Sequence, residues 1–423
     1  MEYKTRVIDS FLEELLPELP AIAIEGAKGV GKTETALRHS KSAIRLDGDE
    51  AVAILHGDFS EIEDAEKPLL IDEWQLAPKV WDYVRRSVDA DNRGGRFLLT
   101  GSATPLPGAR THSGAGRITT FTMRPLSMAE RDLQTPSISL GSLLRGEGEI
   151  GGSSELVLRD YCEEIVRSGF PGIRNRSPRA RLLQLDSYLD YALDRQIEVD
   201  GSVVYRRDVL RSWLAAYGAA TATQANYSTI LDAATAGIPD KPSKSTTEAY
   251  RSYLQRIFML DPVPAWTPAF TPLKRLTLTP KHHLVDPALA VRLAGASVES
   301  LMRGQGTIVG STGESVWLGN LFESLAVQSV RVYAQANDAR VSHLRLQEGR
   351  HEVDIIVEGG DGAVVAMEVK LAATVDDSDV RHLRWLKEQL GDQLVDAIVI
   401  NTGPRAYRRQ DGIGVIPLAL LKP

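Results

Sequence analysis

Residues 26–33 form a glycine-rich loop that constrains the fold of this chain more than any other segment. They read Gly-Ala-Lys-Gly-Val-Gly-Lys-Thr, the G-x-x-x-x-G-K-[ST] pattern, between an apolar run at 21–24 and a helix-favouring run at 34–38. This pattern requires the order strand, loop, helix, because the loop amides and the helix N-terminus bind phosphate together. We therefore expect an α/β fold with a parallel sheet that binds ATP, and an accidental glycine-rich turn is the weaker alternative.

The expected nucleotide contacts run from the first glycine of this loop into the helix after it. Lys32 is expected to reach the β- and γ-phosphates, and Thr33 to offer its hydroxyl to Mg²⁺. The glycines let the backbone curl until its N–H groups face a phosphate. The expected cofactor-binding residues are Gly26, Ala27, Lys28, Gly29, Val30, Gly31, Lys32, Thr33 and Glu34.

Two further apolar runs predict the groups that hydrolysis needs. Leu69-Leu70-Ile71 is followed by Asp72 and Glu73, the Walker B form. Asp72 is expected to hold Mg²⁺ through water, and Glu73 to polarise the attacking water. The run at 96–102 contains Thr100 and Ser102, either of which could sense the γ-phosphate, because ligands gather at the carboxyl ends of strands in open α/β sheets.

Composition sets outer limits on the chain. A length of 423 residues predicts two to four domains, and 43% hydrophobic with 25% charged residues suits globular cores. The single cysteine, Cys162, excludes an internal disulfide and fits a cytoplasmic protein, and we expect neither a signal peptide nor a membrane span. The formal charge of −7 argues against a protein that coats nucleic acid, but it allows local basic grooves.

The expected domains are an ATPase core at 1–125, a helical lid at 126–207, a winged-helix-like region at 208–300 and a last domain at 301–423. A capping box of Ser127 and Glu130 would open the lid, and the glycine-rich stretch 146–154 predicts a flexible linker. Arginine-finger candidates are Arg124, Arg174, Arg176, Arg179 and Arg181, with a solvated basic face as the alternative.

The winged-helix expectation depends on two helices, the second near 245–260, and on a strand-like run at 276–278. As a DNA reader, the second helix would offer Arg251, Tyr253 and Arg256. Packing between domains is an equally good interpretation, because aromatic and aliphatic residues dominate that helix.

The last hundred residues predict a second chemical site. Asp354 lies near the start of a strand-like run at 352–357, a turn follows at 358–362, and Glu368 and Lys370 share one face of the returning strand. Glu323 is the one acid in an apolar helix at 317–327. This is the D-x(n)-E-x-K arrangement of metal-dependent phosphodiester cleavage. Asp354, Glu368 and the Val369 carbonyl would ligate Mg²⁺, and Glu323 would add outer-shell charge or hold a second ion. Lys370 would position or help deprotonate the attacking water, whereas a chance edge-strand sequence or a simple ion pair is the alternative.

At this point the chain resembles, along its whole length, the bacterial and archaeal AAA-like P-loop ATPases with a C-terminal domain of unknown function. The resemblance is carried by the phosphate loop, by 69–73, 98–102, 125–127, 168–171 and 247–250, and by the two motifs around Asp354 and Glu368. It implies ATP hydrolysis, a winged-helix part and a PD-(D/E)xK nuclease-like tail. Gly172 departs from the family pattern, in which an acid commonly follows Phe-Pro, and Ala27-Lys28 replaces a frequent Pro-Arg.

Two functions follow as alternatives. One is an ATP-driven switch or motor coupled to a tail that processes DNA or RNA, with DNA or RNA as the candidate partner. The other is a nucleotide-gated regulatory or scaffold protein whose tail binds partners without cutting. AAA-like ATPases frequently close their sites across a ring, and the sequence does not fix an oligomeric state.

His282, His283 and His351 have no partners at zinc spacing, so hydrogen-bonded histidines are expected.

Overall fold

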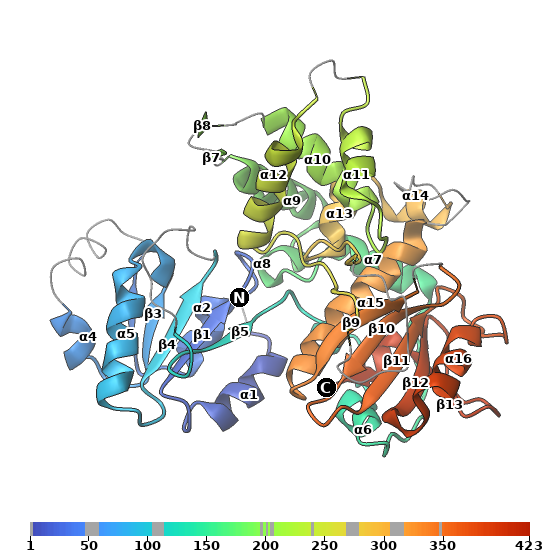
Figure 1. The fold of residues 1–423 in the computed structure, drawn as a ribbon, viewed down its shortest axis with the longest axis horizontal. Coiled ribbons are helices and arrows are strands. Elements are labelled where there is room, and N and C mark those ends of the chain that lie inside the picture. The colour runs from blue at the N-terminus through green and yellow to red at the C-terminus, as the bar shows by residue number, and fades with distance from the viewer. Residues whose placement is uncertain are drawn as a thin grey trace. The chain divides into compact units, whose positions relative to one another are not determined.

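The computed structural model divides the chain into two compact units, Met1–Pro125 with Tyr253–Met259, and Leu126–Ser252 with Leu260–Pro423 (Figure 1). Each unit is described by itself. The structure describes residues 3–46, 59–103, 114–194, 198–199, 202–203, 207–237, 241–267, 279–304, 317–346 and 349–423. The expected wing strand at 276–278 lies outside these residues.

The first unit is built on a parallel five-stranded sheet in the order β2-β3-β4-β1-β5. Its strands are β1 (Ala21–Glu25), β2 (Ser42–Arg45), β3 (Leu69–Asp72), β4 (Phe97–Gly101) and β5 (Thr119–Thr122). The predicted parallel α/β sheet is confirmed. Because β4 lies between β1 and β3, the strand that ends in Thr100 runs directly beside the strand that ends in Asp72.

Short helices complete this unit. They are α1 (Val7–Leu15), α2 (Lys32–Arg38), α4 (Ser60–Asp64) and α5 (Lys79–Ala90), with a 3₁₀ turn at Trp74–Leu76. Val80, Val84 and Val88 recur every four residues along α5, so they share one helix face. That face joins a buried cluster with Ile71 of β3 and Leu99 of β4. The packing anchors the strands whose carboxyl ends carry the candidate site.

The second unit contains a helical part and a mixed sheet. The helical part consists of α7 (Leu158–Arg167), α8 (Pro171–Arg174), α9 (Pro178–Leu193), α10 (Arg207–Ala219), α11 (Tyr227–Ala234), α12 (Lys244–Arg256) as far as Ser252, α13 (Pro287–Leu293) and α14 (Val298–Met302). Strands β7 (Glu198–Val199) and β8 (Ser202–Val203) lie between α9 and α10 in the chain. Every helix among the described residues is too short or too polar to cross a bilayer.

The mixed sheet has the order β13-β14-β12-β11-β10-β9. Its strands are β9 (Arg340–Arg345), β10 (Glu352–Glu358), β11 (Val364–Val369), β12 (Leu394–Asn401), β13 (Tyr407–Arg408) and β14 (Gly414–Pro417). Figure 1 shows this sheet between α15 (Trp317–Gln335) and α16 (Arg381–Leu390). The expected hairpin is present, because β10 and β11 pair antiparallel. A β-bulge interrupts the pairing of β10 with β9 between Val353 and Ile356.

The glycine-rich stretch 146–154 differs from the flexible linker expected from its composition. Ser154 N–H donates to Pro404 O at 2.9 Å, and Ala406 N–H donates to Gly152 O at 3.0 Å. Gly152 has φ 112, a backbone conformation that favours glycine. This glycine-rich stretch is therefore an ordered segment that makes backbone hydrogen bonds with residues of the C-terminal domain. The capping box of Ser127 and Glu130 is present, but it opens only the 3₁₀ turn η2 (Met128–Arg131).

Residues 126–145 contain a strand that pairs with the end of the chain, and the helical lid at 126–207 stays a prediction. β6 (Ile138–Ser139) pairs with β15 (Leu421–Lys422), which follows the 3₁₀ turn η4 (Leu418–Leu420) near the end of the chain. In the same stretch, α6 (Leu140–Leu144) follows β6 directly.

Candidate nucleotide site and a buried carboxylate cluster

The phosphate loop has the backbone that its glycines predict. Gly26 has φ 154, and an added Cβ would lie 2.2 Å from Met123 O, a distance that no side chain tolerates. Gly31 has φ 106 and begins α2 in the left-handed region. Ala27 and Val30, two residues of the loop itself, are fully buried. Glycine is thus needed at both turns, which leaves the loop's amides at the helix N-terminus for an anion.

Lys32 is buried at the start of α2 and contacts the loop itself. Its Nζ donates to Gly26 O at 2.8 Å and to Ala27 O at 3.0 Å. Burial lowers the pKa of Lys32 to about 8, while the carboxylates of Glu73 and Asp72 oppose the shift. These carbonyl contacts can be exchanged for phosphate oxygens, which would satisfy the same donors with full negative charge.

The oxygen groups that fit Mg²⁺ meet at the ends of β3 and β4. Thr33 Oγ1 donates to Asp72 Oδ1 at 2.8 Å, and Thr100 Oγ1 donates to the same oxygen. Asp72 is 8% exposed, so it lies within the fold next to the loop. A hydroxyl and a carboxylate side by side are the ligands that a hard cation takes in P-loop sites.

Glu73 follows β3 in an unusual backbone conformation. Its φ of 58 places a non-glycine residue in the left-handed region, which costs about 1–3 kcal/mol and is characteristic of functional sites. Ser102 Oγ donates to Glu73 Oε2 at 2.8 Å, and Gln75 Nε2 donates to the same oxygen. The two hydroxyls expected as alternative sensors therefore have separate partners: Thr100 contacts Asp72, and Ser102 contacts Glu73.

An N-terminal contact to the phosphate loop was not expected from the sequence. Arg6 donates from NH1 to Val30 O and from NH2 to Arg124 O, both at 2.7 Å. Asp9 accepts a hydrogen bond from the backbone N–H of Arg6 at 2.6 Å. The side chain of Arg6 is 5% exposed and lies 24 and 118 positions from its two acceptors. No local pattern marks such a residue before the fold is known.

ATP binding is expected to weaken as the pH rises above the Lys32 pKa of about 8. Phosphates favour the ammonium form, so binding takes up a proton once Lys32 is neutral. Affinity should therefore fall roughly tenfold between about pH 7 and about pH 9, since each unit above the pKa corresponds to a factor of ten. Fluorescence titration at both pH values, with calorimetry in two buffers to count protons, would check this. A dissociation constant that does not change with pH would contradict it.

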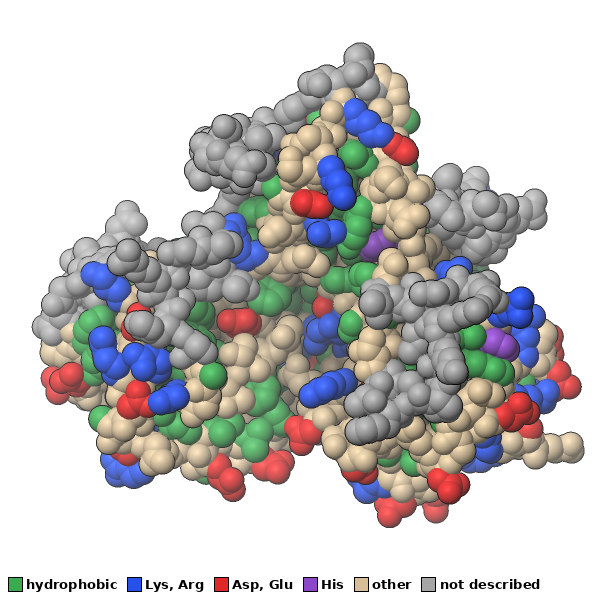
Figure 2. Space-filling model, viewed as in Figure 1, with side chains coloured by type: hydrophobic (Ala, Val, Ile, Leu, Met, Phe, Trp, Pro, Cys, Tyr) green, Lys and Arg blue, Asp and Glu red, His purple; other side chains and the backbone are tan. Residues whose placement is uncertain are grey.

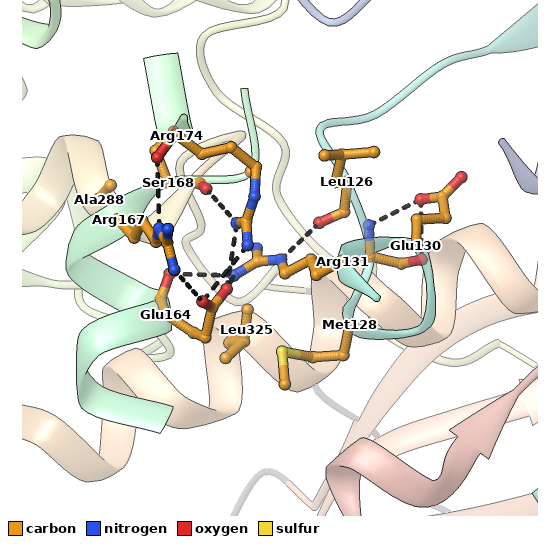
Figure 3. Close-up of polar contacts among 12 residues, drawn as sticks. Leu126, Met128, Glu130, Arg131, Glu164, Arg167, Ser168, Arg174, Ala288 and Leu325 are labelled. Carbon is orange, nitrogen blue, oxygen red and sulfur yellow. Dashed lines mark hydrogen bonds and ion pairs between the residues drawn. The ribbon is translucent and has the colours of Figure 1, made fainter. Parts of the chain in front are cut away.

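The arginine-finger candidates have different surroundings. Figure 3 shows Arg174 in a buried network around Glu164, with Arg131 and Arg167 as its other cations. Arg174 NH1 donates to Glu164 Oε2 at 3.1 Å and to Ser168 O at 2.9 Å. Its side chain is therefore engaged in holding α7 and α8 together, whereas Arg176 and Arg179 are exposed.

The C-terminal acids converge, but on a lysine that the sequence interpretation did not include. Lys281 Nζ lies 2.8 Å from Asp354 Oδ1, 2.9 Å from Glu323 Oε1 and 3.1 Å from Glu352 Oε1. These carboxylates raise the pKa of Lys281 in spite of its burial. Nothing local in the sequence marks Lys281, which stands between Pro280 and His282.

Glu368 and Lys370 pair with each other at the end of β11. Lys370 Nζ lies 3.1 Å from Glu368 Oε2, and Val369 N–H donates to Asp354 Oδ2 at 2.9 Å. Burial raises the pKa of Glu368, and the neighbouring Asp354 carboxylate adds to the shift. Burial also raises the pKa of Glu323, to about 8. Across the described ranges, no three His, Cys, Asp and Glu side chains are grouped so that they could hold a metal ion.

The remaining candidates have ordinary partners. His282 contacts Ala225 O at 2.7 Å, and His283 contacts Ser324 Oγ at 3.2 Å, so both are hydrogen-bonded as expected. Arg251 stacks over Tyr227 at 4.5 Å, and Tyr253 is buried. The buried side chain of Tyr253 is not available to read a groove, and the winged helix itself stays a prediction.

Comparison with family models gave three matches. Residues 18–131 match an AAA domain, residues 158–300 match a Domain of unknown function (DUF8612), and residues 318–421 match a Domain of unknown function (DUF4143). Together with the phosphate loop and the Walker B strand, the first match defines an AAA-like P-loop ATPase domain. The nuclease-like and winged-helix parts of the resemblance stay predictions.

Solved structures that are similar to this chain include the following two. A Walker-type ATPase of Pyrococcus abyssi has 14% identity and a TM-score of 0.36, with 69% of this chain and 98% of that chain covered. The RuvB Holliday junction branch migration motor of Thermotoga maritima has 15% identity and a TM-score of 0.27, with 62% of this chain and 90% of that chain covered. No curated protein matches the chain.

Proposed function

We propose that this chain binds ATP with Mg²⁺ at residues 26–34 and hydrolyses it. The observation that carries the proposal is the convergence of Lys32, Thr33, Asp72, Thr100 and Glu73 at the carboxyl ends of adjacent strands. Mg²⁺ would neutralise charge on the β- and γ-phosphates. Thr33 and Asp72 are the residues that would hold it, because their oxygens already lie 2.8 Å apart.

The other residues have roles that follow from their contacts. The Lys32 ammonium would stabilise negative charge on the β- and γ-phosphates as the bond to the γ-phosphoryl group breaks. Glu73 would accept a hydrogen bond from the attacking water and align it. Ser102 would hold the Glu73 carboxylate in place through the 2.8 Å hydrogen bond. Thr100 would do the same for Asp72.

For the tail, we infer that the domain binds a partner without cutting nucleic acid, which makes the chain a nucleotide-gated regulatory or scaffold protein. The Lys281 contacts support this function, because an ammonium already neutralises Asp354 and Glu323. Figure 2 shows cationic and anionic side chains mixed over the visible, described surface of each unit. A metal-dependent nuclease remains the second candidate, and it is supported by Asp354, Glu368 and Lys370 at the end of the β10–β11 hairpin.

One experiment compares these functions directly. ATP turnover and Mg²⁺-dependent nicking of single- and double-stranded DNA and RNA are measured for wild type and Glu368→Ala. We expect equal ATP turnover in both proteins and no nicking by either. Nicking by wild type that disappears in Glu368→Ala would instead establish the nuclease. Lys32→Ala serves as the control for contaminating ATPase activity, and stimulation of turnover by DNA or RNA would identify that nucleic acid as a partner.

A further inference from the structure

We propose that Lys281 is the built-in cation of the carboxylate cluster formed by Glu323, Glu352 and Asp354, and that it keeps divalent ions out. The inference goes beyond the proposed function, because it concerns which cation the cluster takes. It holds whether or not the tail binds nucleic acid, and it does not depend on ATP turnover.

The geometry matches the donor capacity of an ammonium group. A lysine Nζ carries three N–H bonds and no acceptor, and here three carboxylates surround it at 2.8, 2.9 and 3.1 Å. The acids come from two elements, Glu323 from α15 and the other two from β10. The Lys281 side chain is 2% exposed, so water cannot replace these contacts. Breaking them would leave a buried charge uncompensated, which strongly destabilises a fold.

The backbone fixes the position of this lysine from both sides. Lys281 N–H donates to Val263 O, and Val263 N–H donates to Lys281 O, each at 3.0 Å. On the next residue, His282 N–H donates to Thr223 O at 2.9 Å, and Ala222 N–H donates to His282 O at 2.7 Å. A divalent ion would have to displace the ammonium of a lysine whose backbone makes two hydrogen bonds and whose neighbour His282 makes two more.

A second observation is a buried carboxylate oxygen beside the cluster that has no hydrogen-bond partner. Glu368 is 3% exposed, and its Oε1 is buried without a hydrogen-bond partner, although its other oxygen contacts Lys370 at 3.1 Å. If the ammonium were removed, Asp354, Glu323 and Glu368 would offer oxygen ligands of the kind that a hard divalent cation takes.

Mn²⁺ binding followed by electron paramagnetic resonance, without nucleotide or nucleic acid, tests the proposal. Wild type should show no Mn²⁺ site that depends on Asp354. Lys281→Met, which keeps an unbranched side chain of similar length but removes the charge, should gain one site at least roughly tenfold tighter than any in wild type. The site should disappear again in Lys281→Met/Asp354→Asn. Lys387→Met, on the exposed face of α16, is the matched control and should gain nothing.

The outcomes that would overturn the proposal are separate from those that test ATP hydrolysis. A Mn²⁺ site in wild type that is lost in Asp354→Asn would show that Lys281 does not exclude the ion. A folded Lys281→Met without a new site would also contradict it. Because that variant removes the ammonium that three carboxylates share, its thermal unfolding is also measured with millimolar Mn²⁺, which should raise its Tm and leave that of wild type unchanged. If Lys281→Met does not fold, Lys281→Met/Glu323→Gln carries less unpaired charge and replaces it, and wild type alone still tests the exclusion.

Discussion

Lys32→Ala is expected to abolish ATP binding, with affinity reduced by a hundredfold or more. The ammonium of Lys32 is buried at the start of α2, and it donates to two carbonyls of the loop that would surround the phosphates. Hydrogen bonds to charged groups contribute about 1.5–3 kcal/mol each, and two of them correspond to at least roughly two orders of magnitude in affinity. Titration with a fluorescent ATP analogue, repeated by calorimetry, measures the loss.

The control for this variant is Lys41→Ala, which removes an exposed lysine from the same unit. Lys41 lies 4.0 Å from Glu66, and its side chain is 61% exposed. Its removal should leave ATP affinity unchanged, since solvent-exposed ion pairs contribute little. If Lys32→Ala kept wild-type affinity while its circular dichroism remained that of the folded protein, the loop at 26–33 would not be the phosphate site.

The sequence predicted the first unit well because its signals are local. An apolar run of four or five residues followed by a special turn marks a buried parallel strand, and β1, β3 and β4 lie where such runs predicted them. Gly26 and Gly31 were predicted as turn residues because only glycine adopts their backbone angles without strain. The sequence did not predict the order of the strands, which decides that Thr100 lies beside Asp72.

The contacts that the sequence did not predict join residues far apart in the chain. Arg6 contacts Val30 O and Arg124 O, and Lys281 contacts Glu323 and Asp354, 42 and 73 positions away. Such pairs form only when separate elements pack, so neither the hydrophobic periodicity nor the spacing of residues in the sequence predicts them. The β10–β11 hairpin was predictable, because two apolar runs flank a glycine-rich turn, but its lysine partner was not.

Glycine content alone does not predict whether a segment is a flexible linker or an ordered part of the fold. The stretch 146–154 has the residues of a flexible linker, yet it forms hydrogen bonds with residues 404–406. Glycine increases the conformational freedom of an unpacked chain, and it also allows the backbone to lie close against a neighbouring segment. Only the partner segment, residues 404–406, distinguishes the two uses, and it lies about 250 positions further along the chain.

Glu73→Gln is expected to retain ATP binding and to lose turnover by roughly two to three orders of magnitude, the range typical for removal of a general base. The glutamine keeps the shape of the side chain and an oxygen that can accept the hydrogen bond from Ser102, so the loop and Lys32 are not disturbed. It cannot carry negative charge, and therefore it polarises water far less. Single-turnover hydrolysis with binding measured in parallel separates the two effects.

A matched variant distinguishes the charge of Glu73 from its position. Ser102→Ala removes one of the two donors at Glu73 Oε2 and leaves both the carboxylate and Gln75 in place. Since one neutral hydrogen bond contributes about 0.5–1.5 kcal/mol, turnover in Ser102→Ala should fall by no more than roughly tenfold. If Glu73→Gln hydrolysed ATP at the wild-type rate, Glu73 would not be the general base. Equal losses in both variants would mean that the orientation held by Ser102, more than the charge itself, limits the reaction.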